Sequence, residues 1–303
     1  MSYAKNIASD KGLTARMFLT GLLLVVLWVV LGGVLIAVGV SYLLVIIILM
    51  GAMFGQYWFS DRIALYGMGG RIVTEQEAPQ LHAMVDRLCS MADMPKPKVA
   101  IATTDIPNAF ATGRSPKAAV VCVTTGIQSR LSDPELEAVL AHELSYVAHR
   151  DVAVMTIASS VGMLAGLLTR VALWSSMFTG EDNNGGGAAA ELLIMLVSIL
   201  VYALSFLLTR ALSRYRELAA DRSGAILIGR PSLLASALVK VTGEMSKIPQ
   251  RDLRKAEAFN AFFFTPAFNG KQGVSLANLF ATHPSLDKRL AQLDELSRQM
   301  GQA

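Results

Sequence analysis

The sequence predicts a mostly helical membrane protein with four transmembrane helices and a polar α+β unit that contains a small sheet. Two observations lead to this fold class. The chain of 303 residues is 53% hydrophobic and only 17% charged, with a mean hydropathy of +0.47, which is typical of membrane proteins. Its apolar residues also gather in long runs that alternate with two polar blocks.

The first apolar run extends over residues 17–59 without a charged side chain. As one helix it would be about 65 Å long, roughly twice the thickness of the hydrocarbon core. The segment is therefore better divided into two spans, with the turn near Gly32 and Gly33 or a little later, at 39–41. A cleaved signal peptide is the competing interpretation. The run is too long for one, and no small-residue cleavage site precedes a polar start.

A second transmembrane hairpin is expected over 152–209. One apolar run covers 152–178, with an interruption at Arg170, and another covers 192–208. Between them lies a short acidic, glycine-rich loop, GEDNNGGGAAAE. Such a loop is typical of a turn between two spans.

The remaining residues form a short N-terminus, 1–16, and two polar blocks, 60–151 and 210–303. Neither block is expected to fold alone, but together they are long enough to bury one core. We therefore expect them to be the first and second halves of a single domain that the second hairpin interrupts.

Basic residues flank the apolar runs and predict the orientation of the chain. The loop between the third and fourth spans has no Lys or Arg, whereas the other flanks carry Lys5, Lys11, Arg16, Arg62, Arg71, Arg210, Arg214 and Arg216. Because cytoplasmic flanks carry the excess of positive charge, both termini and both polar blocks are expected in the cytoplasm of a multi-pass plasma (inner) membrane protein. The net charge of +4 includes no dense basic cluster, so no nucleic-acid partner is expected.

Local patterns in the first polar block predict a helix, strands and another helix. An apolar stripe at helical spacing covers 77–91, and the runs KVAIATTD, PNAFATG and AAVVCVTTG are typical of strands. In LSDPELEAVLAHELSYVAHRD, Ser132 and Glu135 have the spacing of a capping box, and Pro134 suits a first helical turn. This last helix is expected to end just before the third span.

The second polar block also predicts helices. One begins at Pro231, and another begins near Ser285 with Leu286, Leu290 and Leu293 directed inward. Five phenylalanines lie between 259 and 268. They are expected either in the core or in a loop at the membrane interface.

The segment AHELSYVAHRD contains part of a zinc-binding pattern. His142 and Glu143 match the first two letters of H-E-x-x-H, in which two histidines one turn apart share a zinc ion. Tyr146 stands where the second histidine would be. An isolated His–Glu pair on a helix is more often an interior pair than a metal site.

A second pair of residues changes this balance. Glu217 and Asp221 are four residues apart in SRYRELAADRSGA, so they share one helix face, about 6 Å apart. A glutamate from a separate helix is a common third zinc ligand, and an aspartate can hydrogen-bond a ligand histidine. An E-x-x-x-D pair alone is usually a solvated face, but beside His142 and Glu143 the coincidence favours a metal site.

At this point the chain resembles a known family, the HtpX-like membrane zinc endopeptidases, which are related to the CAAX prenyl proteases. The resemblance covers most of the chain and includes PNAFATGR, LSDPELEAVLAHELS, RELAADRSGA and ATHPSLDKRL, with a two-span insertion between the second and third of these. It implies a zincin-like catalytic domain with a Zn²⁺ cofactor. It also implies quality control of misfolded or unassembled membrane proteins, cut at cytoplasmic loops near the membrane.

The resemblance also implies roles for individual residues. His142 and Glu217 would be zinc ligands, Glu143 the general base, and Asp221 a partner of a ligand. The position of the second ligand histidine is occupied by Tyr146.

Two further sets of residues follow from the same resemblance. Asn108, Ala109 and Phe110 would lie on an edge strand that aligns the substrate backbone. His283 matches a family histidine near the C-terminus, where it would assist at the site or cap the last helix.

The departure at Tyr146 predicts weak zinc binding and little hydrolysis. A tyrosine ligates as phenolate, and its unperturbed pKa is about 10. His149 is on nearly the same face as His142 but about 10 Å along the axis, so both cannot reach one zinc. His82 is distant in sequence, and no spacing supports it. The tyrosine is either an introduced substitution that silences the enzyme or a natural feature of a pseudoenzyme.

Two other functions are alternatives to a peptidase. A non-catalytic membrane protein that binds clients would not need Glu143 and Glu217 to converge. A transporter is disfavoured because the spans carry one charge, Arg170, and no evident ion path.

Overall fold

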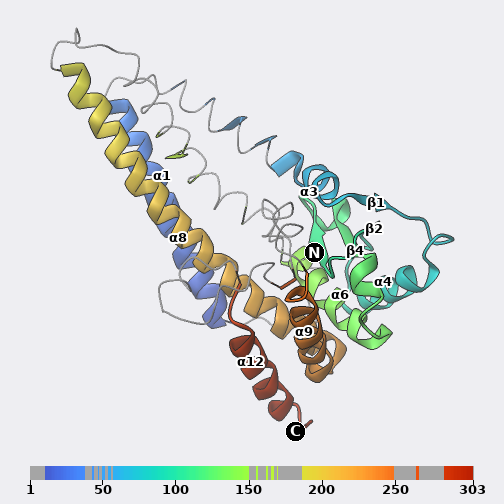
Figure 1. Cartoon of the computed structure of the whole chain (residues 1–303). Coiled ribbons are helices and arrows are strands. Elements are labelled where there is room, and N and C mark those ends of the chain that lie inside the picture. The colour runs from blue at the N-terminus through green and yellow to red at the C-terminus, as the bar shows by residue number, and fades with distance from the viewer. Residues whose placement is uncertain are drawn as a thin grey trace. The chain divides into compact units, whose positions relative to one another are not determined.

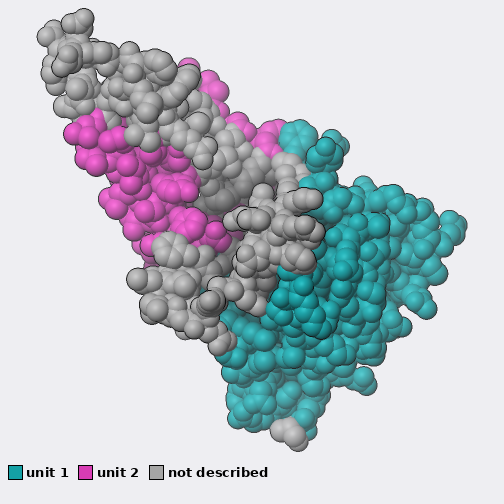
Figure 2. All heavy atoms as spheres, in the orientation of Figure 1, with its two compact units in different colours: residues 1–14, 58–153, 213–303 teal, residues 15–57, 154–212 magenta. Residues whose placement is uncertain are grey.

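The computed structural model describes residues 11–37, 57–149, 186–248, 264–265 and 283–302, together with a few single positions in between. The chain divides into two compact units (Figure 2). Unit 1 consists of residues 1–14, 58–153 and 213–303, and unit 2 of residues 15–57 and 154–212. Each unit is thus assembled from segments that are far apart in the sequence.

Unit 2 contains helix α1, Lys11–Ala37, from residue 15 onward, and the first part of helix α8, Gly186–Ile228 (Figure 1). Both helices contain a segment long and apolar enough to cross a membrane, Phe18–Ala37 in α1 and Leu192–Ile228 in α8. The two helices pack through buried apolar side chains that include Leu24, Leu31 and Val201. The expected second and third spans lie almost entirely outside the described residues.

Helix α1 continues through Gly32 and Gly33, so a turn at this pair, one of the two expected places, is wrong. Glycine breaks a helix in water because it exposes the backbone, but the apolar segments of membrane proteins tolerate it. The later alternative, at 39–41, lies outside the described residues.

Helix α8 has 43 residues, which corresponds to about 65 Å, roughly twice the hydrocarbon thickness. It belongs to unit 2 as far as residue 212 and to unit 1 from residue 213. One continuous helix therefore contains a candidate membrane span and carries Glu217 and Asp221 in its last part.

A four-stranded mixed sheet lies in unit 1, in the order β1-β2-β4-β3. The strands are β1 Gly70–Ile72, β2 Lys98–Ala102, β3 Ala109–Thr112 and β4 Val120–Thr124. Strands β2 and β4 are parallel, and the two outer strands pair antiparallel to them. The three strands expected from sequence are confirmed. The short strand β1 was not predicted, because three residues are too few to show a period.

Helices cover this sheet and connect its strands. They are α3 Ser60–Met68, α4 Pro79–Met91, the 3₁₀ turn η1 Pro116–Ala118, α5 Thr125–Gln128, α6 Asp133–Ala148, α9 Pro231–Met245 and α12 Leu286–Gln299. Helix α6 packs on β3, α4 and α9, and α9 packs in turn on α12 (Figure 1). The largest apolar core lies between these elements and includes Leu88, Val121, Leu140 and Leu238.

The start of α6 agrees with the sequence. The predicted capping box between Ser132 and Glu135 is confirmed. The Glu135 carboxylate also accepts hydrogen bonds from Ser236 and Lys240 on α9, at 2.6 and 2.8 Å. The cap that begins α6 therefore also ties it to α9.

Candidate active site

Helix α6 presents His142, Glu143 and Tyr146 inside unit 1. The side chain of His142 has no exposed surface and that of Glu143 is 4% exposed. The imidazole of His142 lies between two aromatic rings at right angles to it, Tyr146 at 5.1 Å and Phe264 at 5.2 Å between ring centroids. The packing therefore fixes the orientation of the His142 ring.

Helix α8 brings Glu217 and Asp221 to the same place. Gly224 lies on the same face as both, seven residues after Glu217. A Cβ atom at Gly224 would lie 2.7 Å from the backbone nitrogen of His142. Because glycine has no Cβ, the two helices approach closely enough for Asp221 to reach His142.

The contact between Asp221 and His142 sets the state of the imidazole. Oδ1 of Asp221 lies 2.9 Å from Nδ1 of His142, and both side chains are fully buried. An ionised carboxylate only accepts hydrogen bonds, so we assign the ring proton to Nδ1. The buried Nε2 then carries the lone pair. Neither ring nitrogen makes a hydrogen bond of standard geometry to a described residue, so this assignment rests on the close approach of Asp221 to Nδ1.

Arg289 on α12 is a member of the site that the sequence interpretation missed. Its guanidinium donates two hydrogen bonds of 2.7 Å to the two oxygens of Asp221. It donates a third, of 2.8 Å, to the backbone carbonyl of Phe264. Its Nη1 also lies 3.3 Å from Oε2 of Glu217.

A signal for Arg289 was present in the sequence. The buried stripe of α12 is Arg289, Leu293 and Leu296, so the arginine occupies the inward position that had been expected for Leu290. Leu290 is only half-buried. The period of the leucines could have identified a buried arginine, which requires an acidic partner.

His283 lies against the second glutamate. Its Nδ1 is 3.2 Å from Oε2 of Glu217, and its side chain is 2% exposed. The expected alternative, that His283 caps the last helix, is wrong: the N-cap of α12 is Ser285, whose hydroxyl accepts a hydrogen bond from the backbone of Lys288. On this side Glu217 therefore faces the charge of Arg289, with the His283 ring beside it.

Glu143 lies between His142 and the sheet. Its Oε2 accepts a hydrogen bond of 3.0 Å from the backbone N–H of Ala111 on β3, and its Oε1 is 4.0 Å from Nε2 of His142. Burial raises the pKa of Glu143 well above its usual value, and the nearby Glu217 raises it further. A raised pKa makes the Glu143 carboxylate a stronger proton acceptor than a glutamate in water.

Strand β3 is an edge strand. The backbone N–H and C=O groups of successive residues point alternately toward β4 and toward the outer edge. The carbonyl of Asn108 accepts from the backbone of Thr124 on β4, so Phe110, two residues on, also faces β4. Ala109 and Ala111 then direct their backbone groups to the outer edge. The side chain of Phe110 is buried under the sheet with Val120 and Cys122. Of the three residues expected to align a substrate, only Ala109 offers its backbone to the outer edge, together with Ala111, which was not expected.

The side chain of Asn108 has a separate contact. Its Oδ1 accepts a hydrogen bond of 2.9 Å from the backbone N–H of Phe264. The same Phe264 gives its carbonyl to Arg289. Residue 264 therefore links the edge strand to the buried arginine.

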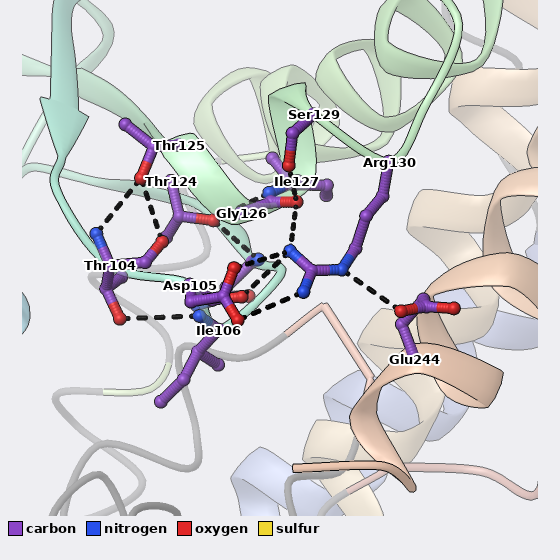
Figure 3. Close-up of polar contacts among 11 residues, drawn as sticks. Thr104, Asp105, Ile106, Thr124, Thr125, Gly126, Ile127, Ser129, Arg130 and Glu244 are labelled. Carbon is purple, nitrogen blue, oxygen red and sulfur yellow. Dashed lines mark hydrogen bonds and ion pairs between the residues drawn. The ribbon is translucent and has the colours of Figure 1, made fainter.

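The loop that leads into β3 is held by a cluster around Arg130 (Figure 3). Arg130 forms two hydrogen bonds of 3.1 Å with the carboxylate of Asp105 and one of 3.2 Å with Glu244 on α9. Gly126 lets the loop pass close by, because a Cβ there would lie 2.3 Å from the carbonyl oxygen of Asp105. This cluster fixes the position from which Asn108 and the edge strand start.

Tyr146 determines whether the residues fit a zinc ion. Its hydroxyl donates a short hydrogen bond to Oε1 of Glu217. Burial raises the pKa of the Tyr146 phenol well above its ordinary value of 10.0, and the Glu217 carboxylate adds to this. The phenol is therefore a neutral donor that takes up an oxygen of Glu217, and a zinc ligand would have to be a phenolate.

The residues present therefore do not complete a zinc site. The Nε2 of His142 and the carboxylate of Glu217 suit a metal, but the third position holds a neutral phenol. No group of three or more His, Cys, Asp or Glu side chains that could hold a metal is found among the described residues.

The fold and the site nevertheless define a class of protein. A buried His–Glu pair on one helix, a Glu and an Asp from a second helix, and an adjacent edge strand form the framework of a metallopeptidase, here in a chain with candidate membrane spans. The model of peptidase family M48 matches residues 75–297. The chain belongs to this family and, within it, to the HtpX-like membrane zinc metalloproteases.

Individual relatives agree with this membership. The chain is 57% identical to Protease HtpX homolog 1 of Streptomyces coelicolor, over 97% of this chain and 96% of that protein. It is 51% identical to a Protease HtpX homolog of Moorella thermoacetica, over 98% of each chain. The crystal structure of S. mikatae Ste24p has a TM-score of 0.55 and 16% identity, over 92% of this chain and 67% of that one. The last similarity shows the fold alone.

Proposed function

We propose that this chain binds polypeptide substrates at the cytoplasmic surface of the membrane, as a quality-control protease would, and that Tyr146 leaves it inactive or strongly impaired in hydrolysis. The observation that carries this proposal is the hydrogen bond from the Tyr146 hydroxyl to Glu217. Tyr146 places a neutral phenol where an imidazole ligand would be, and the phenol hydroxyl also occupies an oxygen of Glu217. In the complete site, His142 and Glu217 would be ligands, and Glu143 the general base.

The geometry around the edge strand supports the substrate part of the proposal. Ala109 and Ala111 turn their backbone groups to the outer edge of the sheet, where an extended peptide can add as a further strand. The N–H of Ala111 already donates to Glu143, so an added strand would pair with the other outward groups of Ala109 and Ala111, beside the site. The edge strand does not depend on Tyr146, so the chain can retain client binding without cleavage.

We further propose that the two polar blocks form one catalytic unit on the cytoplasmic side. The grouping of residues 58–153 with 213–303 in one compact unit supports this, and the basic flanks support the orientation. A cysteine introduced at Asn184 should be labelled by a membrane-impermeant thiol reagent on intact cells. The native Cys89 and Cys122 are buried, with thiol pKa values raised to about 12, so they should give little background. Labelling only after lysis would contradict this topology.

Replacing Tyr146 by His tests the function directly. We expect the unaltered full-length chain to contain little zinc and to cleave an unfolded membrane-protein substrate slowly or not at all. Tyr146→His should raise zinc content toward one ion per chain and raise cleavage at least 10–100-fold, since even the loss of a ligand's hydrogen-bonding partner costs that much. Adding Glu143→Gln should abolish cleavage and leave zinc bound.

The outcomes separate the hypotheses. If Tyr146→His stays metal-free and inert, position 146 is not the missing ligand. If the unaltered chain already holds one zinc and cleaves as fast as Tyr146→His, the impaired function is refuted. If neither protein cleaves but both capture the unfolded substrate, the chain is a client-binding protein.

A further inference from the structure

Both oxygens of the Glu217 carboxylate face polar groups of the protein, although only Oε1 makes a hydrogen bond to a described residue. Oε1 accepts the hydrogen bond from the Tyr146 hydroxyl. Oε2 lies 3.2 Å from Nδ1 of His283 and 3.3 Å from Nη1 of Arg289. A buried carboxylate left without such partners would cost several kcal/mol. In a complete metal site, the ion would meet part of this need.

The side chain of Tyr146 is held on more than one side. The guanidinium of Arg216 lies 4.9 Å from the ring centroid, in a cation–π contact. The edge of the ring meets the His142 imidazole at 5.1 Å. These contacts restrict the ring, so the hydroxyl needs little further ordering to reach Glu217.

We propose that the Tyr146 hydroxyl replaces the metal ion structurally. It binds the Glu217 carboxylate, so that unit 1 folds and is stable without a bound metal. The tyrosine hydroxyl supplies the fixed donor that Glu217 would otherwise find in the ion. In many metalloproteins the free energy of metal binding contributes to folding, and chelators then destabilise them. In this chain the internal hydrogen bond removes that dependence. The inference rests on the proposal that Tyr146 leaves the zinc site incomplete.

The test compares thermal unfolding of the full-length chain in detergent, with excess chelator and with added zinc, at one scan rate. Tyr146→Phe removes only the hydroxyl and keeps the ring contacts. Tyr146→His replaces the internal donor by a metal ligand. Tyr66→Phe is the matched control, because it removes a phenol hydroxyl from a side chain that is 92% exposed.

We expect the unaltered chain to unfold at the same temperature in chelator and in zinc. Tyr146→Phe should unfold roughly 3–8 °C lower in chelator, since a hydrogen bond to a charged group is lost. Tyr146→His should be lowered by a similar amount in chelator, or fail to fold there, and zinc should restore it. Tyr66→Phe should match the unaltered chain throughout.

Two results would overturn the inference. One is an unaltered chain whose unfolding temperature falls on chelation. The other is a Tyr146→Phe variant that unfolds in chelator together with the unaltered chain, because the hydroxyl would then contribute nothing. Neither result depends on cleavage, and zinc content is measured on the same samples. A failure of the proposed function, seen as one zinc and full activity in the unaltered chain, is therefore distinguishable from a failure of this inference.

Discussion

Two arginines in unit 1 each join segments that are far apart in the sequence, but one is buried and the other is near the surface. Arg289 is 2% exposed and binds the carboxylate of Asp221, which has no exposed surface. Arg130 is 22% exposed, and its partner Asp105 is 86% exposed. Both arginines form hydrogen bonds to a carboxylate and to a backbone carbonyl.

The two arginines differ in whether water can replace a hydrogen-bonding partner that is removed. Around Arg130, water can solvate any group whose contact is broken, so the net free energy of each contact is small. Around Arg289, water has no access, and each carboxylate must be satisfied by protein. Although the two arginines have similar hydrogen-bond geometry, the buried one should be far more sensitive to substitution.

The largest effect is expected at Arg289. Arg289→Met should lower the free energy of unfolding by about 3–5 kcal/mol, because it leaves the buried carboxylate of Asp221 without its charge partner. Denaturant unfolding of the solubilised chain measures this. Arg289→Lys is the control: it keeps the charge but loses the two-pronged contact, so an intermediate loss is expected. A loss of less than about 1 kcal/mol for Arg289→Met would contradict the assigned role.

An intermediate effect is expected at Glu135, whose side chain is 5% exposed while its partner Lys240 is 49% exposed. Burial alone would raise the pKa of Glu135, but hydrogen bonds from Lys240 and Ser236 lower it to about 2. A lowered pKa in the folded state stabilises the protein above the unfolded pKa of about 4.5. This contribution is lost as the pH falls from there toward 2.

Glu135→Gln should therefore flatten the pH dependence of unfolding between about pH 5 and pH 2. At pH 7 it should cost roughly 1–3 kcal/mol, less than a fully buried pair because Lys240 reaches water. The variant is compared with the unaltered chain in denaturant titrations at several pH values. Parallel pH profiles for the two proteins would show that Glu135 does not titrate as assigned.

The smallest effect is expected at Arg130. Arg130→Gln should cost only about 0.5–1 kcal/mol, and the cost should shrink at high salt, because the ion pair with Asp105 is solvated. Arg87→Gln is a matched control. Arg87 also forms an exposed ion pair, at 2.6 Å from Glu137, but this pair does not hold the loop before β3. A cost at Arg130 as large as that at Arg289 would mean that burial does not explain the difference.

Local patterns in the sequence predicted several elements of unit 1, but neither the short strand β1 nor the contacts between the elements. Apolar periods and capping residues identified α6 and the strands β2, β3 and β4. The spacing of Glu217 and Asp221 indicated a shared helix face, and the departure of Tyr146 from the H-E-x-x-H pattern was visible in the sequence alone. The turn at Gly32 and Gly33 was misplaced, because glycine has a different effect in an apolar helix than in water.

The contacts that the sequence could not supply join distant residues. Arg289 meets Asp221 across 68 positions, and Phe264 meets Asn108 across 156. The need for glycine at position 224 follows only from the close approach of the His142 backbone.

By itself, then, the sequence indicated most of the helices and strands, the alternation of apolar and polar segments, and the departure of Tyr146 from the H-E-x-x-H pattern. Only the tertiary structure decided that the Tyr146 hydroxyl binds Glu217, that Arg289 is buried against Asp221, and that Glu143 holds the N–H of Ala111. The physical reason is that secondary structure follows from periods of two to four residues along the chain. Charge pairing and hydrogen bonding in a dry interior instead depend on which helices pack together and how closely they approach.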